Sequence, residues 1–519
     1  MFRKTNKKPT IDIFGDYDRV YTNSSYAEKL FAPTAWHNIF YENVYQMIDE
    51  ALFAPLYSDA MGAPNASIAT LVSMSAIKES FNLSDKMLFD QFRYHTQFRM
   101  AIGIRNLNDK IPSETAYYDF RRKLTRYEVS NKQSSLMDIC FQKTTRKQAI
   151  KFNVSGKKIR MDSKLIGSQI SWDSRYVLIH KTLYTFWRAL SASEKQKAHP
   201  EDQSYLALLF KEKADHITYT ETPEELHQRL VHLGEIIHRF LSLYSPNSHK
   251  HYALLPRLFE EQYTASDPAI ITLLPKQKIA AKSLQSPHDP DSTYRKKGDK
   301  QSKGYVVNVT ETCGDDELHL ITSVQCAPNV TPDNSFVQSS IETSESVLET
   351  DVEQVIADGA YHSVENDEYA ENNPDLDIIY TGFQGREPRF ELIEEKEQLM
   401  AKDSQSGQIY HCYLVRKNKR SKEESKRWYC LVEGKRYYFS ESAVEAARQR
   451  AKLAKRSKEE LQRRNNVEAT MFLFGWGLWK NKIRYRGLVR ASIWSFARAL
   501  AINFKRIVGY MCPKPAEIG

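Results

Sequence analysis

Apolar residues recur at helical spacing in two neighbouring stretches near the start of the chain. The first set is Ile68, Leu71, Val72 and Ala76, and the second is Leu88, Phe92 and Phe98. Such spacing places apolar side chains along one side of a helix, and residues 82–85 (NLSD) between the two sets are good helix-capping residues. The pattern predicts a pair of helices that resembles a helix-turn-helix.

A third predicted helix begins after Pro112, where Ser113 can serve as its N-terminal cap. One side of this helix is apolar and the other is basic, with Tyr117, Phe120 and Leu124 opposite Arg121, Arg122 and Lys123. Such a helix fits a DNA-binding domain or a plain helical bundle, and the pattern leaves both open. We predict an all-α N-terminal domain over residues 1–150, with DNA binding as the favoured role.

The pattern changes to short apolar or alternating segments after about residue 153. Five of them are typical of β-strands: 158–164, 304–311, 318–324, 352–358 and 376–381. The fourth, VEQVIAD, is mostly apolar, as in a strand that is buried on both faces of a sheet. These segments predict an α/β domain built on a sheet over residues 151–519.

Two long segments interrupt this set of strands. Residues 174–264 are helical in pattern, with Leu226, Leu230, Leu233 and Ile237 at near-helical spacing. Residues 384–457 are rich in Glu, Lys and Arg and contain a possible β-hairpin around residues 433–435. We therefore expect two insertions in the α/β domain, at about 174–290 and 384–457.

Composition and charge narrow the class of protein. With 41% hydrophobic and 12% aromatic residues the chain has enough apolar material for a core, which excludes global disorder. Six cysteines without CxxC spacing, and no apolar run of about 18 residues, predict a cytoplasmic protein without a membrane span. The net charge of +9 and the basic runs 448–464 and 480–490 favour a polyanionic partner, although solvated helix faces explain such runs as well.

Three acidic residues occupy positions that a sheet or a buried helix would present. Asp162 lies within the first predicted strand, Asp358 ends the most apolar one, and Glu468 begins an apolar helical run. A carboxylate at the end of a buried strand is costly unless it is paired or binds a cation. From the residues alone, other roles stay open: a polar strand position, a helix cap before Gly359, and an ion pair between Glu468 and Arg464.

Four motifs occur in an order that resembles bacterial insertion-sequence DDE transposases with a ribonuclease-H-like core. They are MDSKLIGS around Asp162, DSTYRKKGDKQSKGYVVNVTET, ADGAYHS around Asp358, and RRNNVEATMF around Glu468 followed by KIRYRGLVR and INFKRI. The segments SAIKESFNLSDKMLFDQFRYHTQFRMAIGI and IPSETAYYDFRRKL resemble the N-terminal domain of this family. The resemblance covers most of the chain. It implies a ribonuclease-H-like mixed sheet with helical and mixed insertions, preceded by an all-α domain.

The resemblance further implies a DNA transposase, an enzyme that cuts and rejoins the ends of its own mobile element. Asp162, Asp358 and Glu468 are then the catalytic residues and the metal ligands. Two divalent ions about 4 Å apart can activate the attacking oxygen and stabilise the leaving oxygen of a phosphodiester. Carboxylates are the hard oxygen ligands that suit Mg²⁺, with Mn²⁺ as a substitute.

Basic and aromatic residues at both ends of the chain are expected to contact DNA phosphates. They are Arg464, Lys480, Lys482, Arg484, Tyr485, Arg486, Arg490, Arg121 and Arg122. A Lys that often follows the Glu in the family would fall at Gly475 and is absent, so Lys480 or Lys482 would have to replace it. Three nearby tryptophans are expected in the core rather than in base stacking: Trp476, Trp479 and Trp494.

The expected partners are double-stranded DNA, both terminal repeats and target, and further copies of the chain in a homodimer or larger assembly on DNA. We expect a cytoplasmic, nucleoid-associated bacterial protein without membrane contact. Two alternatives stay open: a catalytically inactive, DNA-binding descendant of a transposase, and a related metal-dependent nuclease that cuts DNA without joining it. Hydrolysis and strand transfer would use the same three carboxylates, so the sequence does not separate them.

Overall fold

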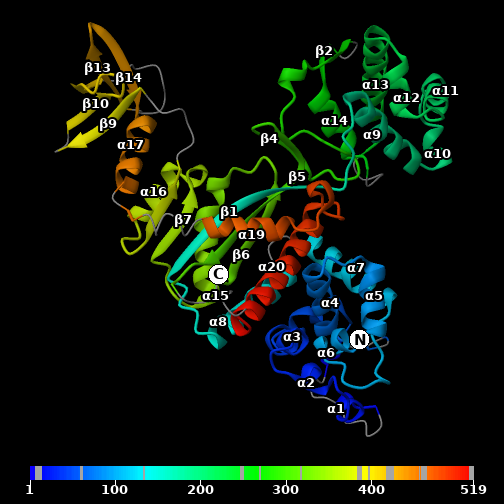
Figure 1. Cartoon of the computed structure of the whole chain (residues 1–519). Helices are drawn as coiled ribbons and strands as arrows, with labels where there is room; N and C mark the ends of the chain where they lie inside the picture. The colour runs from blue at the N-terminus through cyan, green and yellow to red at the C-terminus, as the bar shows by residue number, and fades with distance from the viewer. Residues whose placement is uncertain are drawn as a thin grey trace.

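A six-stranded mixed sheet forms the centre of the computed structural model (Figure 1). Its strands are β1 (Lys158–Gly167), β4 (Thr293–Lys297), β5 (Lys300–Thr312), β6 (Ile321–Pro328), β7 (Gln354–Asp358) and β8 (Asp377–Thr381). The order is β4-β5-β1-β7-β8, with β6 also paired to β5. Strand β5 runs antiparallel to β1, β4 and β6, whereas β7 is parallel to both β1 and β8. All five strands predicted from the sequence are present, so the mixed α/β class is confirmed.

The structure describes most of the chain. The described residues are all except 6, 8–14, 59–61, 63, 132–134, 246–250, 268–269, 316–317, 383–388, 396–397, 416–425, 455, 458–464 and 514–519.

Helices cover both faces of the sheet. On one face, α15 (Val337–Leu348) packs through Val337 and Ile341 on apolar residues of β1 and β7. On the other face lie α19 (Asn465–Gly475) and α20 (Leu488–Met511), two helices from the C-terminal end of the chain. Short helices α16 (Val364–Glu371), η4 (Asp333–Phe336) and η5 (Gly359–Tyr361) connect the strands at the edge.

The N-terminal part is helical, as predicted. Its main helices are α4 (Ile68–Ser80), α5 (Asp85–Tyr94), α7 (Glu114–Ser130) and α8 (Leu136–Lys151), with shorter α1 (Tyr17–Tyr21), α2 (Ala27–Phe31), α3 (Trp36–Phe40) and α6 (Thr96–Ala101). Ser84 caps α5 and Ser113 caps α7, each by accepting a hydrogen bond from a backbone N–H in the first turn. Both capping predictions are confirmed.

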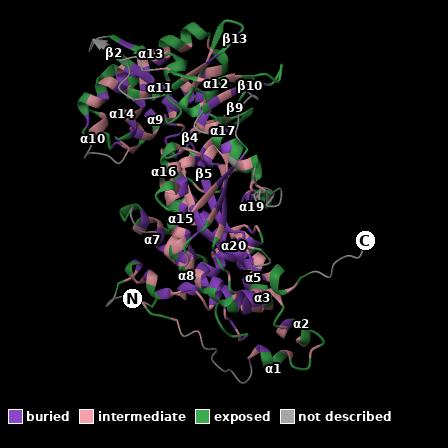
Figure 2. Ribbon diagram, turned by 90° about the vertical axis from the view of Figure 1, so that its left-hand side faces the viewer, coloured by how far each residue is buried: buried purple, intermediate pink, exposed green. Residues whose placement is uncertain are grey.

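The N-terminal helices and the sheet share one hydrophobic core. Helix α20 packs against α4, α8 and β6, so Val72 and Phe141 belong to the same buried cluster as Val309 and Leu500. Figure 2 shows this buried zone running through the middle of the molecule. The start of β1 therefore marks a change from helices to strands, but not a break between two cores.

Two lobes project from the sheet where the insertions were predicted (Figure 1). The helical lobe has its own buried cluster and contains α9 (Arg175–Ala189), α10 (Ala192–Lys195), α11 (Pro200–Leu209), α12 (Ala214–Thr220), α13 (Pro223–Leu243), α14 (Leu254–Gln262), β2 (Tyr263–Asp267) and β3 (Ile270–Leu273). The β-rich lobe contains β9 (Phe390–Glu395), β10 (Gln398–Asp403), β11 (Ile409–His411), β12 (Tyr413–Val415), β13 (Arg427–Val432), β14 (Lys435–Ser440) and α17 (Glu441–Ala454). The predicted hairpin is the β13–β14 pair, in which Trp428 faces Phe439 and Cys430 faces Tyr437.

Candidate active site and nucleic-acid interface

Asp162 and Asp358 lie on neighbouring parallel strands at equivalent positions. The ladder between β1 and β7 pairs Lys158 with Gln354 and Arg160 with Ile356, and each Asp stands two residues beyond that last pair. Side chains at equivalent positions of parallel strands point to the same face, so the structure places both carboxylates on one face of the sheet. The aspartates are half-buried, and each accepts a hydrogen bond from the next backbone N–H, at 2.8 and 2.7 Å.

The pKa of the buried Tyr361 is affected by the charges of both aspartates. Burial is the first cause that raises the pKa of the Tyr361 hydroxyl, and the negative charges of Asp162 and Asp358 raise it further. Because Coulomb interactions weaken with distance, their joint effect on one side chain agrees with the adjacency given by the strand ladder.

Glu468 lies on α19, the helix that packs on β1. Its side chain is exposed, whereas Val467 and Thr470 beside it are buried against the protein. Within the described residues, the three predicted carboxylates do not form a group with all ligand atoms within 4.8 Å of one another; His362, Asp367 and Glu445 do. The structure thus brings the two aspartates to one face and the helix of Glu468 onto β1, without closing a three-carboxylate cluster.

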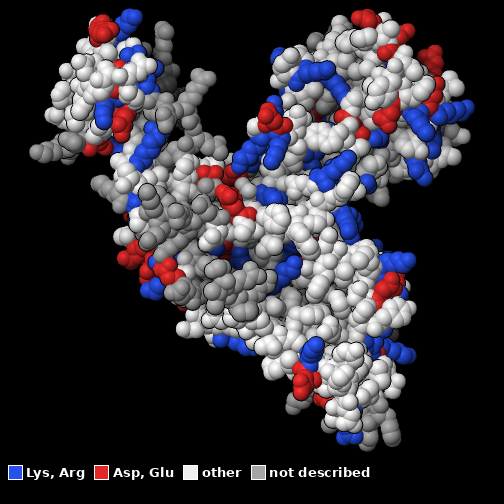
Figure 3. All heavy atoms as spheres, in the orientation of Figure 1, with Lys and Arg blue, Asp and Glu red and all other residues white. Residues whose placement is uncertain are grey.

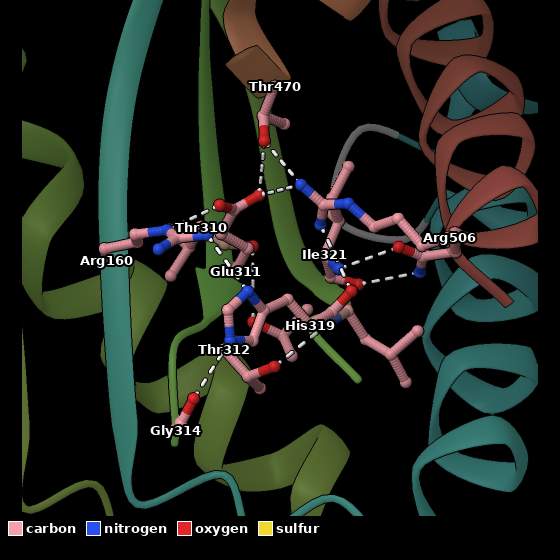
Figure 4. Close-up of polar contacts among 12 residues, drawn as sticks. Arg160, Thr310, Glu311, Thr312, Gly314, His319, Ile321, Thr470 and Arg506 are labelled. Atoms are coloured by element: carbon pink, nitrogen blue, oxygen red, sulfur yellow. Dashed lines mark hydrogen bonds and ion pairs between the residues drawn. The ribbon is translucent and has the colours of Figure 1, made fainter. Parts of the chain in front are cut away.

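A buried ion-pair network holds α19 on the sheet (Figure 4). Glu311 of β5 is fully buried and accepts hydrogen bonds from Arg160 of β1 and Arg506 of α20, both at 2.6 Å. Thr470 of α19 donates a third hydrogen bond to the same carboxylate at 2.7 Å. Arg160 and Asp162 are two residues apart on β1 and share a face, so the network fixes α19 over the face that carries Asp162.

The charge of Glu311 is retained despite complete burial. Desolvation acts to raise its pKa, but the guanidinium groups of Arg506 and Arg160 and the Thr470 hydroxyl outweigh it and hold the pKa of Glu311 below its usual value. A buried carboxylate that lost these partners would be strongly unfavourable.

Removing the charge of Glu311 should therefore loosen α19 and destabilise the protein. Glu311→Gln leaves the buried Arg160 and the half-buried Arg506 without a counter-charge, and breaking a buried pair costs about 3 to 5 kcal/mol. We expect a lower melting temperature, measured by thermal denaturation. The matched control is Glu353→Gln, which breaks an exposed pair with Lys157 and should melt like the wild type. Equal melting of the two variants would show that the network does not hold α19.

A strongly basic cavity of about 600 Å³ is lined by Ser163 and Lys164, the two residues that follow Asp162. It lies between β1, the β4–β5 hairpin and the segment after α19, and its cationic lining consists of Lys164, Arg295, Lys297, Lys300, Lys303, Lys480 and Lys482. The acidic residue in the lining, Asp333, is paired with Arg295 at 3.3 Å and accepts a hydrogen bond from Ser163. Lys and Arg side chains also gather on the surface below the helical lobe in Figure 3. The excess of cations in this cavity suits a polyanion such as a phosphate backbone.

Lys164 occupies the space that a side chain at position 475 would need. A Cβ on Gly475 would stand 2.6 Å from Cε and 2.8 Å from Nζ of Lys164. Gly475 lies seven residues after Glu468, close to two helical turns, so both face the same side of α19. Burial is the main cause that lowers the pKa of Lys164; Asp162 opposes this and Lys300 adds to it.

Sequence reasoning did not single out Lys164. It stands two residues after Asp162, and on a strand this spacing places both side chains on one face. That signal could have drawn attention to the pair. It could not have shown that Gly475 leaves room for the lysine.

Most of the predicted DNA-binding residues after α19 lie in the segment that joins α19 to α20, and Arg490 lies at the start of α20. Several of them also hold this segment in place: Lys482 donates to the carbonyl of Ile170 at 2.6 Å, Arg486 to that of Gln169 at 2.7 Å, and Arg484 to that of Leu83 at 3.3 Å. Lys480 is exposed at the basic cavity. Arg464 lies outside the described residues. The contact of these residues with DNA stays a prediction.

Tyr485, from the C-terminal region, contacts residues of the N-terminal helices. The guanidinium group of Arg121 lies 4.8 Å from the centre of its ring, and Lys78 donates to its hydroxyl at 3.1 Å. Arg121, Arg122 and Arg490 line a second cavity with Tyr485, of about 330 Å³. The structure therefore gathers predicted DNA-binding residues from α7 and from the C-terminal region at one place.

The expectation that all three tryptophans lie in the core is wrong for two of them. Trp479 is 81% exposed and Trp476 is 40% exposed, whereas Trp494 is buried and donates a hydrogen bond to Glu79. Helix α19 ends at Gly475, and the following turn contains Gly477 and Lys480 at positive φ. Trp476 and Trp479 come after the end of α19, so they lie in this turn and not on the buried side of the helix.

A comparison with protein families decides the general class. Residues 30–123 match the family described as "Transposase domain (DUF772)". This part of the chain is similar to a transposase domain. The match supports a transposase of the insertion-sequence type, and hence a DNA-processing enzyme with DNA as its partner. It covers α4, α5 and the first part of α7, which include the predicted helix pair and Arg121 and Arg122.

Two further comparisons gave no match, either among curated proteins or among solved structures. Among the described residues, no helix is long and apolar enough to cross a membrane.

Proposed function

We propose that this transposase cleaves the ends of its mobile element by metal-dependent phosphodiester hydrolysis and joins them to target DNA by strand transfer. The observation that carries the proposal is the equivalent placement of Asp162 and Asp358 on adjacent parallel strands. Strand order adds support for a ribonuclease-H-like core: β6-β5-β1-β7-β8, with β5 alone antiparallel to β1.

The donor set fits a divalent cation. Asp162 and Asp358 offer hard oxygen ligands from one sheet face, and Glu468 would complete the set from α19, since its exposed side chain is free to turn toward the sheet. Bound Mg²⁺, or Mn²⁺ in its place, would supply activation of the attacking oxygen and stabilisation of the leaving oxygen. The network around Glu311 would hold α19 close enough to the sheet for Glu468 to reach the two aspartates.

The cations beside Asp162 would hold the DNA. The basic cavity would bind phosphates near the carboxylates, with Lys164 closest to the reacting group. In the first step water attacks the phosphorus and the 3′ oxygen leaves with a proton as a hydroxyl. In the second step that hydroxyl attacks a target phosphodiester and displaces its 3′ oxygen. The first step converts one phosphodiester into a 5′ phosphate and a 3′ hydroxyl, and the second exchanges one phosphodiester for another, so no protein nucleophile is required.

The direct test uses the purified protein with duplexes that carry the DNA flanking its open reading frame on each side. We expect strand cleavage at the element borders in Mg²⁺ and none in EDTA, and joined products when target DNA is added. Binding in EDTA should weaken steeply with salt, with a slope of about 0.9 per phosphate contact in a log–log plot. Cleavage without joining would identify a nuclease, and binding without cleavage in either metal would identify an inactive descendant.

A further inference from the structure

A ladder of tyrosines crosses the outer face of the sheet β12-β13-β14 in the β-rich lobe. Tyr413, Tyr429 and Tyr438 stand on successive strands, because the strand pairing sets Tyr413 against Tyr429 and Tyr429 against Tyr438. Their ring centroids are 5.6 and 6.0 Å apart. Trp428 and Cys430 alternate with these residues and point into the core of the lobe.

This outer face is open and positively charged. Tyr413 and Tyr438 are 53% and 49% exposed. The exposed Arg436 and Arg427 place their guanidinium groups 5.2 Å from the ring centre of Tyr429 and 5.1 Å from that of Tyr438. Cross-strand aromatic pairs stabilise a small sheet by themselves, but this role needs neither exposed rings nor arginines on top of them. Flat rings beside cations are the surface on which unpaired bases stack and phosphates are held.

The spacing of the ladder favours a single strand over a duplex. Neighbouring bases in a duplex strand rise by about 3.4 Å, less than the distance between successive rings here. Bases inside a duplex are also stacked and paired, so their faces are not accessible to a protein sheet. Bases of an unpaired strand can be spread out and placed on successive aromatic side chains.

The lobe is connected at both ends to elements of the candidate active site. It follows β8, which pairs with the strand of Asp358, and its last helix α17 precedes the helix of Glu468. Helix α17 also packs on β8, so the lobe has a direct mechanical connection to the catalytic sheet.

We propose that the outer face of β12-β13-β14 binds single-stranded DNA through its tyrosine ladder and two arginines. The inference rests on the proposed function, in which cleavage frees strand ends that must be held until they are joined. The ligand class is a single DNA strand without a sequence requirement, because every base offers a π-face.

Full-length protein in EDTA, titrated into fluorescein-labelled oligothymidylate and followed by fluorescence anisotropy, tests the proposal. Tyr429→Ala with Tyr438→Ala should weaken binding by about tenfold or more for the pair, since each base stack on an aromatic side chain is worth about 1 to 3 kcal/mol. Binding of a blunt duplex should change by less than about twofold, because the basic cavity is untouched. The matched control, Tyr219→Ala, removes a tyrosine that is 89% exposed on α12 and should bind like the wild type.

Two further variants keep the test decisive if the alanine variant does not fold. Tyr429→Phe with Tyr438→Phe retains the rings and should keep wild-type affinity. Arg427→Gln with Arg436→Gln leaves the ladder but should weaken binding and reduce its salt dependence. The proposal is overturned if the wild type does not bind oligothymidylate, if the alanine variant binds it normally, or if it loses single-strand and duplex binding alike. Intact cleavage of element ends with any of these results would leave the proposed function standing and remove this inference alone.

Discussion

Asp162→Asn and Asp358→Asn are each expected to abolish Mg²⁺-dependent cleavage of element ends, by about a thousandfold or more, while a DNA gel shift is retained. Asn has the size of Asp but not its charge, so a bound metal ion loses a hard anionic ligand. The residues that we propose to hold phosphates are other ones, which line the basic cavity and the cavity around Tyr485. Loss of a residue that acts as part of a catalytic set removes most of the rate enhancement, which motivates the magnitude.

The third carboxylate gives the same experiment a discriminating control. Glu468→Gln should lose cleavage like the two aspartate variants, because Gln lacks the charge of Glu. It should fold normally, because Gln keeps the helix propensity and size of Glu on α19. Glu445→Gln should cleave normally, although Glu445 belongs to the described group of possible metal ligands with His362 and Asp367. All four proteins should have similar melting temperatures. Normal cleavage by Glu468→Gln together with a loss in Glu445→Gln would move the third ligand to α17.

Lys164→Ala is expected to lower the cleavage rate by about a hundredfold to a thousandfold, with the carboxylates intact. A preorganised charge that stabilises the transition state is worth about 2.7 to 4 kcal/mol when removed from other enzymes, which corresponds to this range. Lys164 shares a face with Asp162 and reaches the side of α19 that carries Glu468. Single-turnover cleavage of a prebound duplex would measure the chemical step separately from DNA binding.

Moving the lysine from position 164 on β1 to position 475 on α19 tests whether its ammonium group acts through its location. Lys164→Ala removes the side chain that a Cβ at position 475 would meet at 2.6 Å, so the double variant with Gly475→Lys has room for an ammonium group at that site. We expect the double variant to recover much of the lost cleavage, whereas in Gly475→Lys alone the flexible side chain of Lys164 would have to move aside. Lys300→Ala, elsewhere in the basic cavity, serves as the control and should affect binding more than cleavage. Loss of binding and cleavage in equal measure for Lys164→Ala would show that the residue contributes only to the cavity's general charge.

The elements of the fold could be predicted because their signals are local. The spacing of apolar residues predicts the strands around Asp162 and Asp358. Together with caps such as Ser113, it also predicts the helix before Asn131. Helical spacing also indicated the first insertion, whereas the second was indicated by its richness in Glu, Lys and Arg and by a possible hairpin. The two tryptophans after α19 were misplaced because the positive-φ turn at Gly477 and Lys480 is not visible in apolar spacing.

The sequence by itself determined five strands of the central sheet, the main N-terminal helices, the order of the four motifs and the three candidate carboxylates. Only the tertiary structure decided which of these residues meet. Lys78 and Tyr485 are 407 positions apart, and Glu311 joins residues from β1, α19 and α20. The period of a helix or strand tells which side is buried, but it does not tell which other element covers that side. Close packing of distant segments made that choice, and it alone revealed that Lys164 stands where Gly475 has no side chain.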